Sequence, residues 1–142
     1  MAKYPRLALV MHAPLGQAFQ ACVEHVLSAG AAFQVFDIHA DDDVPDWVQK
    51  VVDFYHQEPD SPVLLLCDVV GATPFNISRL AQTAIAQEGG QADVIVGANL
   101  GMVLKSVCDR QTAPECFVET IVQSAGKAIA VFKADLDKDK DK

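Results

Sequence analysis

The sequence RLALVMHAPLG fills residues 6–16 and decides the fold. Its first six residues, Arg6–Met11, form a short and almost wholly apolar run, which is typical of a strand buried on both faces of a sheet. Pro14 follows, and proline is favoured in the first turn of a helix. Beyond it, apolar residues recur at the spacing of one helix face: Leu15, Ala18, Phe19, Cys22, Val23, Val26 and Leu27. The stretch therefore predicts a buried strand that leads directly into an amphipathic helix, with Gly30 placed to end it.

The same alternation of apolar runs and helical periods continues to the end of the chain. Further strands are predicted at Ala32–Ile38, Pro62–Asp68, Ala92–Ala98 and Lys127–Lys133. Helices are predicted after Asp41–Asp43, from Pro74 to Gly89, at Gly101–Asp109 and at Pro114–Ala125. This order predicts an α/β fold with a doubly wound, mainly parallel sheet and helices on both faces. We expect the strand order to be about 2-1-3-4, which is common in such sheets. The run Lys127–Lys133 is expected as an additional C-terminal strand at an edge.

Length and charge restrict the kinds of protein to consider. The 142 residues suit one domain, expected over residues 1–134, followed by a charged tail at 135–142 that we expect to be disordered. Apolar runs are too short for a membrane span, and the N-terminus lacks the pattern of a signal peptide, so we expect a cytoplasmic protein without membrane insertion. The net charge of −8 argues against nucleic acid as a partner and favours a protein with a basic surface.

The four cysteines lie in apolar stretches and form no CxxC pair: Cys22, Cys67, Cys108 and Cys116. We expect buried free thiols in a reducing compartment, because a zinc site would need paired spacing. A site formed by His12, His39 and Asp68 matches no metal motif, so no metal is expected. His25, His39 and His56 are predicted to be surface residues.

His12 and Asp68 are the predicted centre of the chemistry. In a doubly wound sheet, ligands bind beyond the carboxyl ends of the strands, at the place where the strand order reverses. That place lies between the first and third strands, and His12 and Asp68 stand at their ends. A carboxylate on one ring nitrogen fixes the tautomer of a histidine and leaves the other nitrogen free to attack. We assign His12 Nε2 as the nucleophile and Asp68 as the group that orients Nδ1.

The surroundings of these two residues are suited to a phosphoryl group, whose transfer mainly needs positioning and donors for three oxygens. The helix that begins at Pro14 offers free amides directly after His12 and Ala13. The loop after Asp68 offers a second set, with Gly71 allowing close backbone approach and Thr73 placed as a helix N-cap. We expect Ala13, Gly71 and Thr73 to bind phosphate, although Thr73 is equally suited to capping alone.

Three segments, in order, carry a family resemblance: Val10–Gly16, Asp68–Asn76 and Val94–Met102. Over roughly Arg6–Lys133 the chain resembles the mannose-type IIA proteins of the bacterial phosphoenolpyruvate-dependent sugar phosphotransferase system. In place of the Thr-His-Gly triplet that is common in that family, it has Met11-His12-Ala13.

The resemblance implies a phosphotransferase that needs no cofactor, whose histidine receives a phosphoryl group from phospho-HPr and passes it to a IIB protein or domain. It also implies a homodimer in which the last strand joins the sheet of the partner. Asn76, Asn99 and Met102 are expected to form a wall of the site or to contact a partner. The alternatives are a helix cap for Asn76 and core packing for Met102.

Other functions fit the same residues. One is the related subunit that donates phosphoryl groups in a dihydroxyacetone kinase system, and another is a regulatory binding module without a transport role. A flavodoxin-like FMN binder has the same fold, but the segment His12–Gly16 lacks the hydroxyl- and glycine-rich loop of an FMN site. A nucleotide-using kinase is disfavoured because the chain has no GxxxxGK[ST] loop.

Overall fold

The centre of the computed structural model, which describes residues 4–28, 32–111 and 115–134, is a sheet of four parallel strands. They are β1 (Arg6–His12), β2 (Phe33–Ile38), β3 (Val63–Cys67) and β4 (Ala92–Ile95), in the order β2-β1-β3-β4. The predicted order of strands is thus confirmed. β1 and β3 are central and adjacent, so their carboxyl ends meet at one edge of the sheet.

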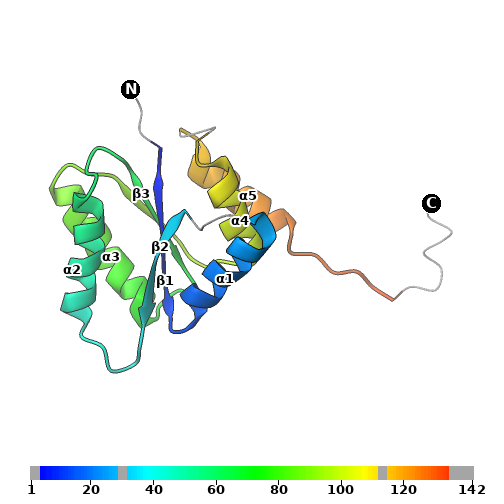
Figure 1. Cartoon of the computed structure of the whole chain (residues 1–142), viewed down its shortest axis with the longest axis horizontal. Coiled ribbons are helices and arrows are strands. Elements are labelled where there is room, and N and C mark those ends of the chain that lie inside the picture. The colour runs from blue at the N-terminus through cyan, green and yellow to red at the C-terminus, as the bar shows by residue number, and fades with distance from the viewer. Residues whose placement is uncertain (1–3, 29–31, 112–114, 135–142) are drawn as a thin grey trace.

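Helices cover both faces of this sheet (Figure 1). They are α1 (Leu15–Leu27), α2 (Val44–His56), α3 (Thr73–Gln87), α4 (Leu100–Asp109) and α5 (Phe117–Lys127). One core cluster joins the sheet to α2 and α3, and a second joins it to α1, α4 and α5. Successive residues of β1 alternate between the clusters, since Ala8 and Val10 belong to the first while Leu9 and Met11 belong to the second. This alternation explains the continuous apolar run at residues 6–11.

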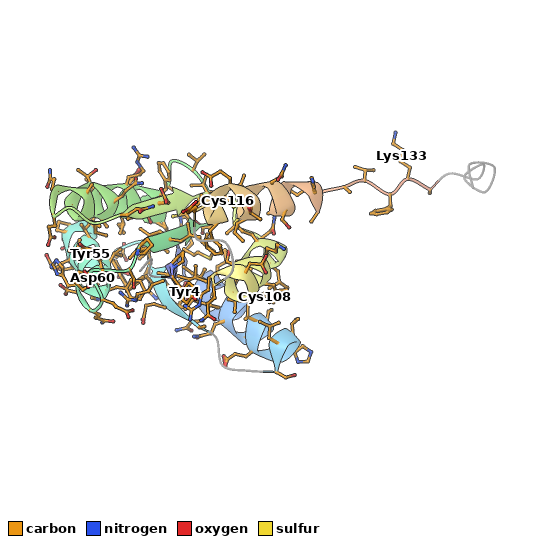
Figure 2. The ribbon with its side chains drawn as sticks, turned by 90° about the horizontal axis from the view of Figure 1, so that it is seen from above. Tyr4, Tyr55, Asp60, Cys108, Cys116 and Lys133 are labelled. Carbon is orange, nitrogen blue, oxygen red and sulfur yellow. The ribbon has the colours of Figure 1, made fainter. Side chains whose placement is uncertain are left out.

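The prediction of a C-terminal strand at Lys127–Lys133 was wrong for the single chain. Lys127 is the last residue of α5, and no strand is assigned at 128–134. The segment leads away from the helices, with Lys133 far out along it (Figures 1 and 2). Strands form only by pairing with a neighbour, and nothing pairs with this segment in the part of the chain described. Ile129, Val131 and Phe132 are therefore 75%, 80% and 95% exposed.

Two further expectations are corrected. The strand predicted at Ala92–Ala98 ends at Ile95. Of the four cysteines only Cys67 is buried, because it lies in central strand β3, whereas the others occupy helices or their ends at the surface. Burial raises the pKa of the Cys67 thiol to about 11, in spite of its hydrogen bond with Ser78. Gly30, Pro114 and the predicted tail 135–142 lie outside the described residues.

In the described part of the chain, no helix is both long and apolar enough to cross a membrane.

Candidate functional site

His12 and Asp68 are in direct contact at the carboxyl edge of the sheet. Parallel pairing sets Val10 beside Cys67, so His12, two residues after Val10, and Asp68, directly after Cys67, come to the same edge of the sheet. His12 Nδ1 lies 2.7 Å from Asp68 Oδ2, and the backbone amide of His12 donates to the same oxygen at 2.9 Å. The sequence prediction that these two side chains meet is thereby confirmed, including the ring nitrogen involved.

Asp68 is held as a carboxylate. Burial alone would raise its pKa, but hydrogen bonds from the amide and ring of His12 and from the amide of Val69 outweigh this effect and lower the pKa. An ionised carboxylate only accepts hydrogen bonds, so Nδ1 of His12 carries the proton in this pair. Nε2 is then the unprotonated nitrogen of the neutral ring. The side chain of Asp68 is 10% exposed, whereas that of His12 is 51% exposed, so a second molecule can reach the histidine.

The loop after β3 forms one side of the site. Gly71 has a φ of +80°, a conformation that glycine adopts without steric cost. The loop is tied to the chain after β4, since the amide of Gly97 donates to the Asp68 carbonyl at 3.1 Å. Val69 and Val70 project from it and are 52% and 68% exposed. The site is therefore an open surface bordered by exposed aliphatic side chains.

Thr73 does not cap α3 as predicted. Ala72 is the N-cap residue, and Thr73 is the first residue of the helix. Thr73 is exposed, and its hydroxyl makes no hydrogen bond within the described residues. The hydroxyl is thus free for a ligand. Asn76, one turn along, is also exposed, and its amide closes the first turn on the Ala72 carbonyl at 3.0 Å.

The amides at the N-terminus of α1 were expected to face a ligand, but two of them donate to a side chain of the protein instead. The carboxylate of Asp37, on β2, accepts hydrogen bonds from the amides of Gly16 and Gln17 at 2.7 and 3.0 Å. A protein carboxylate therefore occupies the anion-binding end of this helix. Sequence reasoning did not identify Asp37 as a site residue. The one feature of the sequence that could have indicated it is a carboxylate between two apolar residues, Phe36 and Ile38, in a predicted strand.

Asn99 and Met102 have structural roles. The side-chain oxygen of Asn99 accepts the amide of Met102 at 2.8 Å and caps α4. Met102 is 4% exposed and packs in the second core cluster, which is the alternative considered for it. Asn99 is partly buried in the loop after β4, so it borders the same edge of the sheet as Asp68.

The remaining histidines lie at the surface as predicted. His56 Nε2 lies 2.8 Å from Glu88 Oε1, linking α2 to α3 away from the site. His39 follows β2, and its amide donates to Asp42 at 2.8 Å. Over residues 4–28, 32–111 and 115–134, no group of three or more His, Cys, Asp or Glu side chains is arranged to hold a metal ion.

Comparison with known proteins gives a consistent family. The EIIA-man family model, described as the fructose IIA component of the phosphotransferase system, matches residues 6–122. The structure is similar to a mannose/sorbose-specific IIA subunit from Enterococcus faecalis, with a TM-score of 0.80 and 20% identity over 94% of this chain and 98% of that one.

Two further solved structures are similar. For the phosphotransferase component EIIA from Streptococcus agalactiae the TM-score is 0.74, with 22% identity over 89% of this chain and 96% of that one. For a IIA protein associated with the fucose utilization operon of Streptococcus pneumoniae the TM-score is 0.73, with 15% identity over 92% of this chain and 96% of that one. No curated protein sequence gives a match.

Proposed function

The chain belongs to the EIIA-man family of phosphotransferase system IIA components, and we propose that it is a phosphohistidine carrier that takes a phosphoryl group onto His12. The observation that carries the proposal is the contact between His12 Nδ1 and Asp68 Oδ2 at 2.7 Å. In the neutral ring this contact places the proton on Nδ1 and leaves Nε2 free on a half-exposed side chain, which is what an attacking imidazole requires.

In the proposed reaction, the lone pair of His12 Nε2 attacks the phosphorus of a phosphohistidine on the donor protein. The N–P bond of the donor breaks, and its electron pair returns to the donor ring. His12 becomes positively charged as the new N–P bond forms, and Asp68 stabilises that charge through the Nδ1 hydrogen bond. The phosphoryl group later leaves to an acceptor, and the neutral His12 ring is restored.

Three backbone and side-chain groups are proposed to hold the phosphoryl oxygens: the Gly71 region, the Thr73 hydroxyl and the backbone at Ala13. The unpartnered hydroxyl of Thr73 at the start of α3 supports this assignment. A helix N-terminus also favours an anion through its dipole. The Ala13 amide is the weakest of the three candidates, because it already donates to the Ile38 carbonyl at 3.0 Å.

The proposed donor is phospho-HPr, and the proposed acceptor is a IIB protein or domain, with all steps in the cytoplasm. Val69 and Val70 support protein docking, since these exposed aliphatic side chains directly follow Asp68, the residue that contacts the histidine. The net charge of −8 favours partners with basic surfaces. Transfer of label from the phosphorylated protein to IIB would support the transport route. Transfer to a dihydroxyacetone kinase subunit alone, or to no acceptor, would favour the related kinase system or a regulatory role.

We also propose a homodimer formed through residues 128–134. This segment exposes Ile129, Val131 and Phe132, which one chain leaves without a partner. An extended segment of this kind can add to the sheet edge of a second copy, where its backbone groups and apolar side chains would be covered. Residues 1–134 would then act as one phosphocarrier domain.

The first test of the carrier function is incubation of the protein with phosphoenolpyruvate, enzyme I and HPr, followed by intact mass. We expect the mass of one phosphoryl group to be added and to be lost in acid. His12→Ala should abolish the addition, and His39→Ala, the exposed histidine after β2, should retain it. A protein that gains no mass with a cognate HPr, or that still gains it as His12→Ala, contradicts the proposal.

A further inference from the structure

Asp37 ties the first turn of α1 to strand β2 through both oxygens of its carboxylate. Oδ1 accepts the amide of Gly16 at 2.7 Å, and Oδ2 accepts the amide of Gln17 at 3.0 Å. Amides at the start of a helix have no partner within the helix. The start of α1 is thus anchored by a side chain of the neighbouring strand, since Pro14, its N-cap, makes no side-chain hydrogen bond.

Gly16 makes this anchor possible. A Cβ atom at Gly16 would overlap Asp37 Oδ1 and would lie 2.6 Å from Val35 Cγ1. Gly16 is buried, although Leu15 and Gln17 on either side of it are exposed. The absence of a side chain therefore lets α1 approach β2 closely enough for the carboxylate to reach two successive amides.

The anchor lies directly beside the nucleophile. Asp37 is paired in register with Met11, the residue before His12. The amide of Ala13 donates to the Ile38 carbonyl at 3.0 Å. The turn that leaves His12 is consequently held by β2 at both of its ends, at Ala13 and at Gly16. His12 itself is held from the other side by Asp68 on the β3 side of β1.

We propose that Asp37 is a positioning residue for the phosphorylation of His12, an inference that rests on the proposed function. It keeps the turn in the arrangement in which His12 Nδ1 meets Asp68. It also occupies the amides of Gly16 and Gln17, two of the groups at the start of α1 that would otherwise be free to bind an anion. A phosphoryl group on His12 is then repelled from the α1 side and bound by the loop after β3, where Gly71 and Thr73 lie.

The test compares Asp37→Ala and Asp37→Asn with Asp43→Ala. Asp43 is a matched control, because its carboxylate also caps a helix, accepting the Asp46 amide at the start of α2. Two quantities are measured for each protein. One is the rate of His12 phosphorylation by phospho-HPr, resolved into kcat and KM. The other is the pair of imidazole nitrogen chemical shifts of unphosphorylated His12, which report the tautomer.

For Asp37→Ala we expect kcat to fall about tenfold to a hundredfold, since small displacements of a reacting group have effects of this size. KM for phospho-HPr should stay unchanged. The nitrogen shifts should move from a single Nδ1–H tautomer toward a mixture. Asp37→Asn keeps one acceptor and should give an intermediate result. Asp43→Ala should lower the melting temperature without altering kcat or the shifts.

Wild-type nitrogen shifts in a folded Asp37→Ala protein would overturn the inference, whatever the rate. Should that variant fail to fold, Asp37→Asn, with its unchanged size, supplies the same comparison and the same criterion. If the wild-type protein accepts no phosphoryl group, the proposed function fails by itself. The nitrogen shifts still decide whether Asp37 sets the tautomer and position of His12.

Discussion

At the scale of single residues, Asp68 determines what His12 can do. Asp68→Asn keeps the shape of the side chain but replaces one oxygen by an NH₂ group, which cannot accept the Nδ1 proton. We expect the opposite tautomer to gain population and the phosphorylation rate to fall on the order of 100-fold or more. The measurement is the initial rate with phospho-HPr, beside Asp60→Asn, an exposed carboxylate before β3 (Figure 2). Equal rates for the two variants would contradict the role given to Asp68.

The lowered pKa of Asp68 also predicts a pH dependence of stability. A carboxyl group whose pKa is lower in the folded state than its ordinary 3.8 stabilises the fold above that value. This contribution is lost as the pH falls through the folded-state pKa. The difference in unfolding free energy between wild type and Asp68→Asn should therefore shrink below about pH 4. Urea denaturation at a series of pH values checks this, and a difference that grows toward acid would refute it.

At the scale of elements, N-cap side chains stabilise two of the helices, α2 through Asp43 and α4 through Asn99. Asp43 caps α2 by accepting the Asp46 amide at 3.1 Å. Replacing an N-cap aspartate by alanine costs about 1 kcal/mol, so Asp43→Ala should lower the unfolding free energy by about that amount. Urea denaturation measures the change. Asp41→Ala, an exposed neighbour without a capping bond, should differ from wild type by less than about 0.5 kcal/mol. A loss in Asp41→Ala as large as in Asp43→Ala would show that the cap is not the cause.

At the scale of the whole molecule, the exposed C-terminal segment predicts association. We expect the full chain to sediment as a dimer and a Val131→Lys/Phe132→Lys double variant to sediment as a monomer. A lysine at these positions would have to be buried in the partner's surface, at a cost that outweighs the remaining contacts. Lys133→Ala is the control and should remain dimeric. A monomeric wild-type protein, or a dimeric double variant, would contradict the proposed assembly.

Much of the fold and the central pair of the site could be predicted from local patterns. Continuous apolar runs indicated strands buried on both faces, and the alternation with helical periods indicated a parallel sheet. Once β1 and β3 were expected to be neighbours, His12 and Asp68 had to meet, because parallel strands bring their carboxyl ends to the same edge. The pairing of Val10 with Cys67 is the register that this prediction required.

Other features had no sufficient local signal. The cap of α1 comes from Asp37, a residue 21 positions away from Gly16, and the pattern around Pro14 contains nothing that points to it. The apolar alternation at 127–133 is typical of a strand, yet a strand also needs a partner edge, and none pairs with this segment among the residues that the structure describes. The burial of Cys22 could not be predicted for a similar reason. The spacing of apolar residues shows which face of the helix is apolar, but it does not show how much of that face the neighbouring elements cover, and Cys22 is exposed.

The sequence by itself determined the alternation of strands and helices and the residues at the strand ends, because hydrophobic period is a property of local pattern, and the strand order common in such sheets then brought His12 and Asp68 together. Only the tertiary structure decided which amides remain free beside His12. Asp37 takes the Gly16 and Gln17 amides of α1, while the Thr73 hydroxyl at the loop after β3 stays open. The physical reason is that a hydrogen bond between distant residues depends on the packing distance between a helix and a strand, here set by the missing side chain of Gly16.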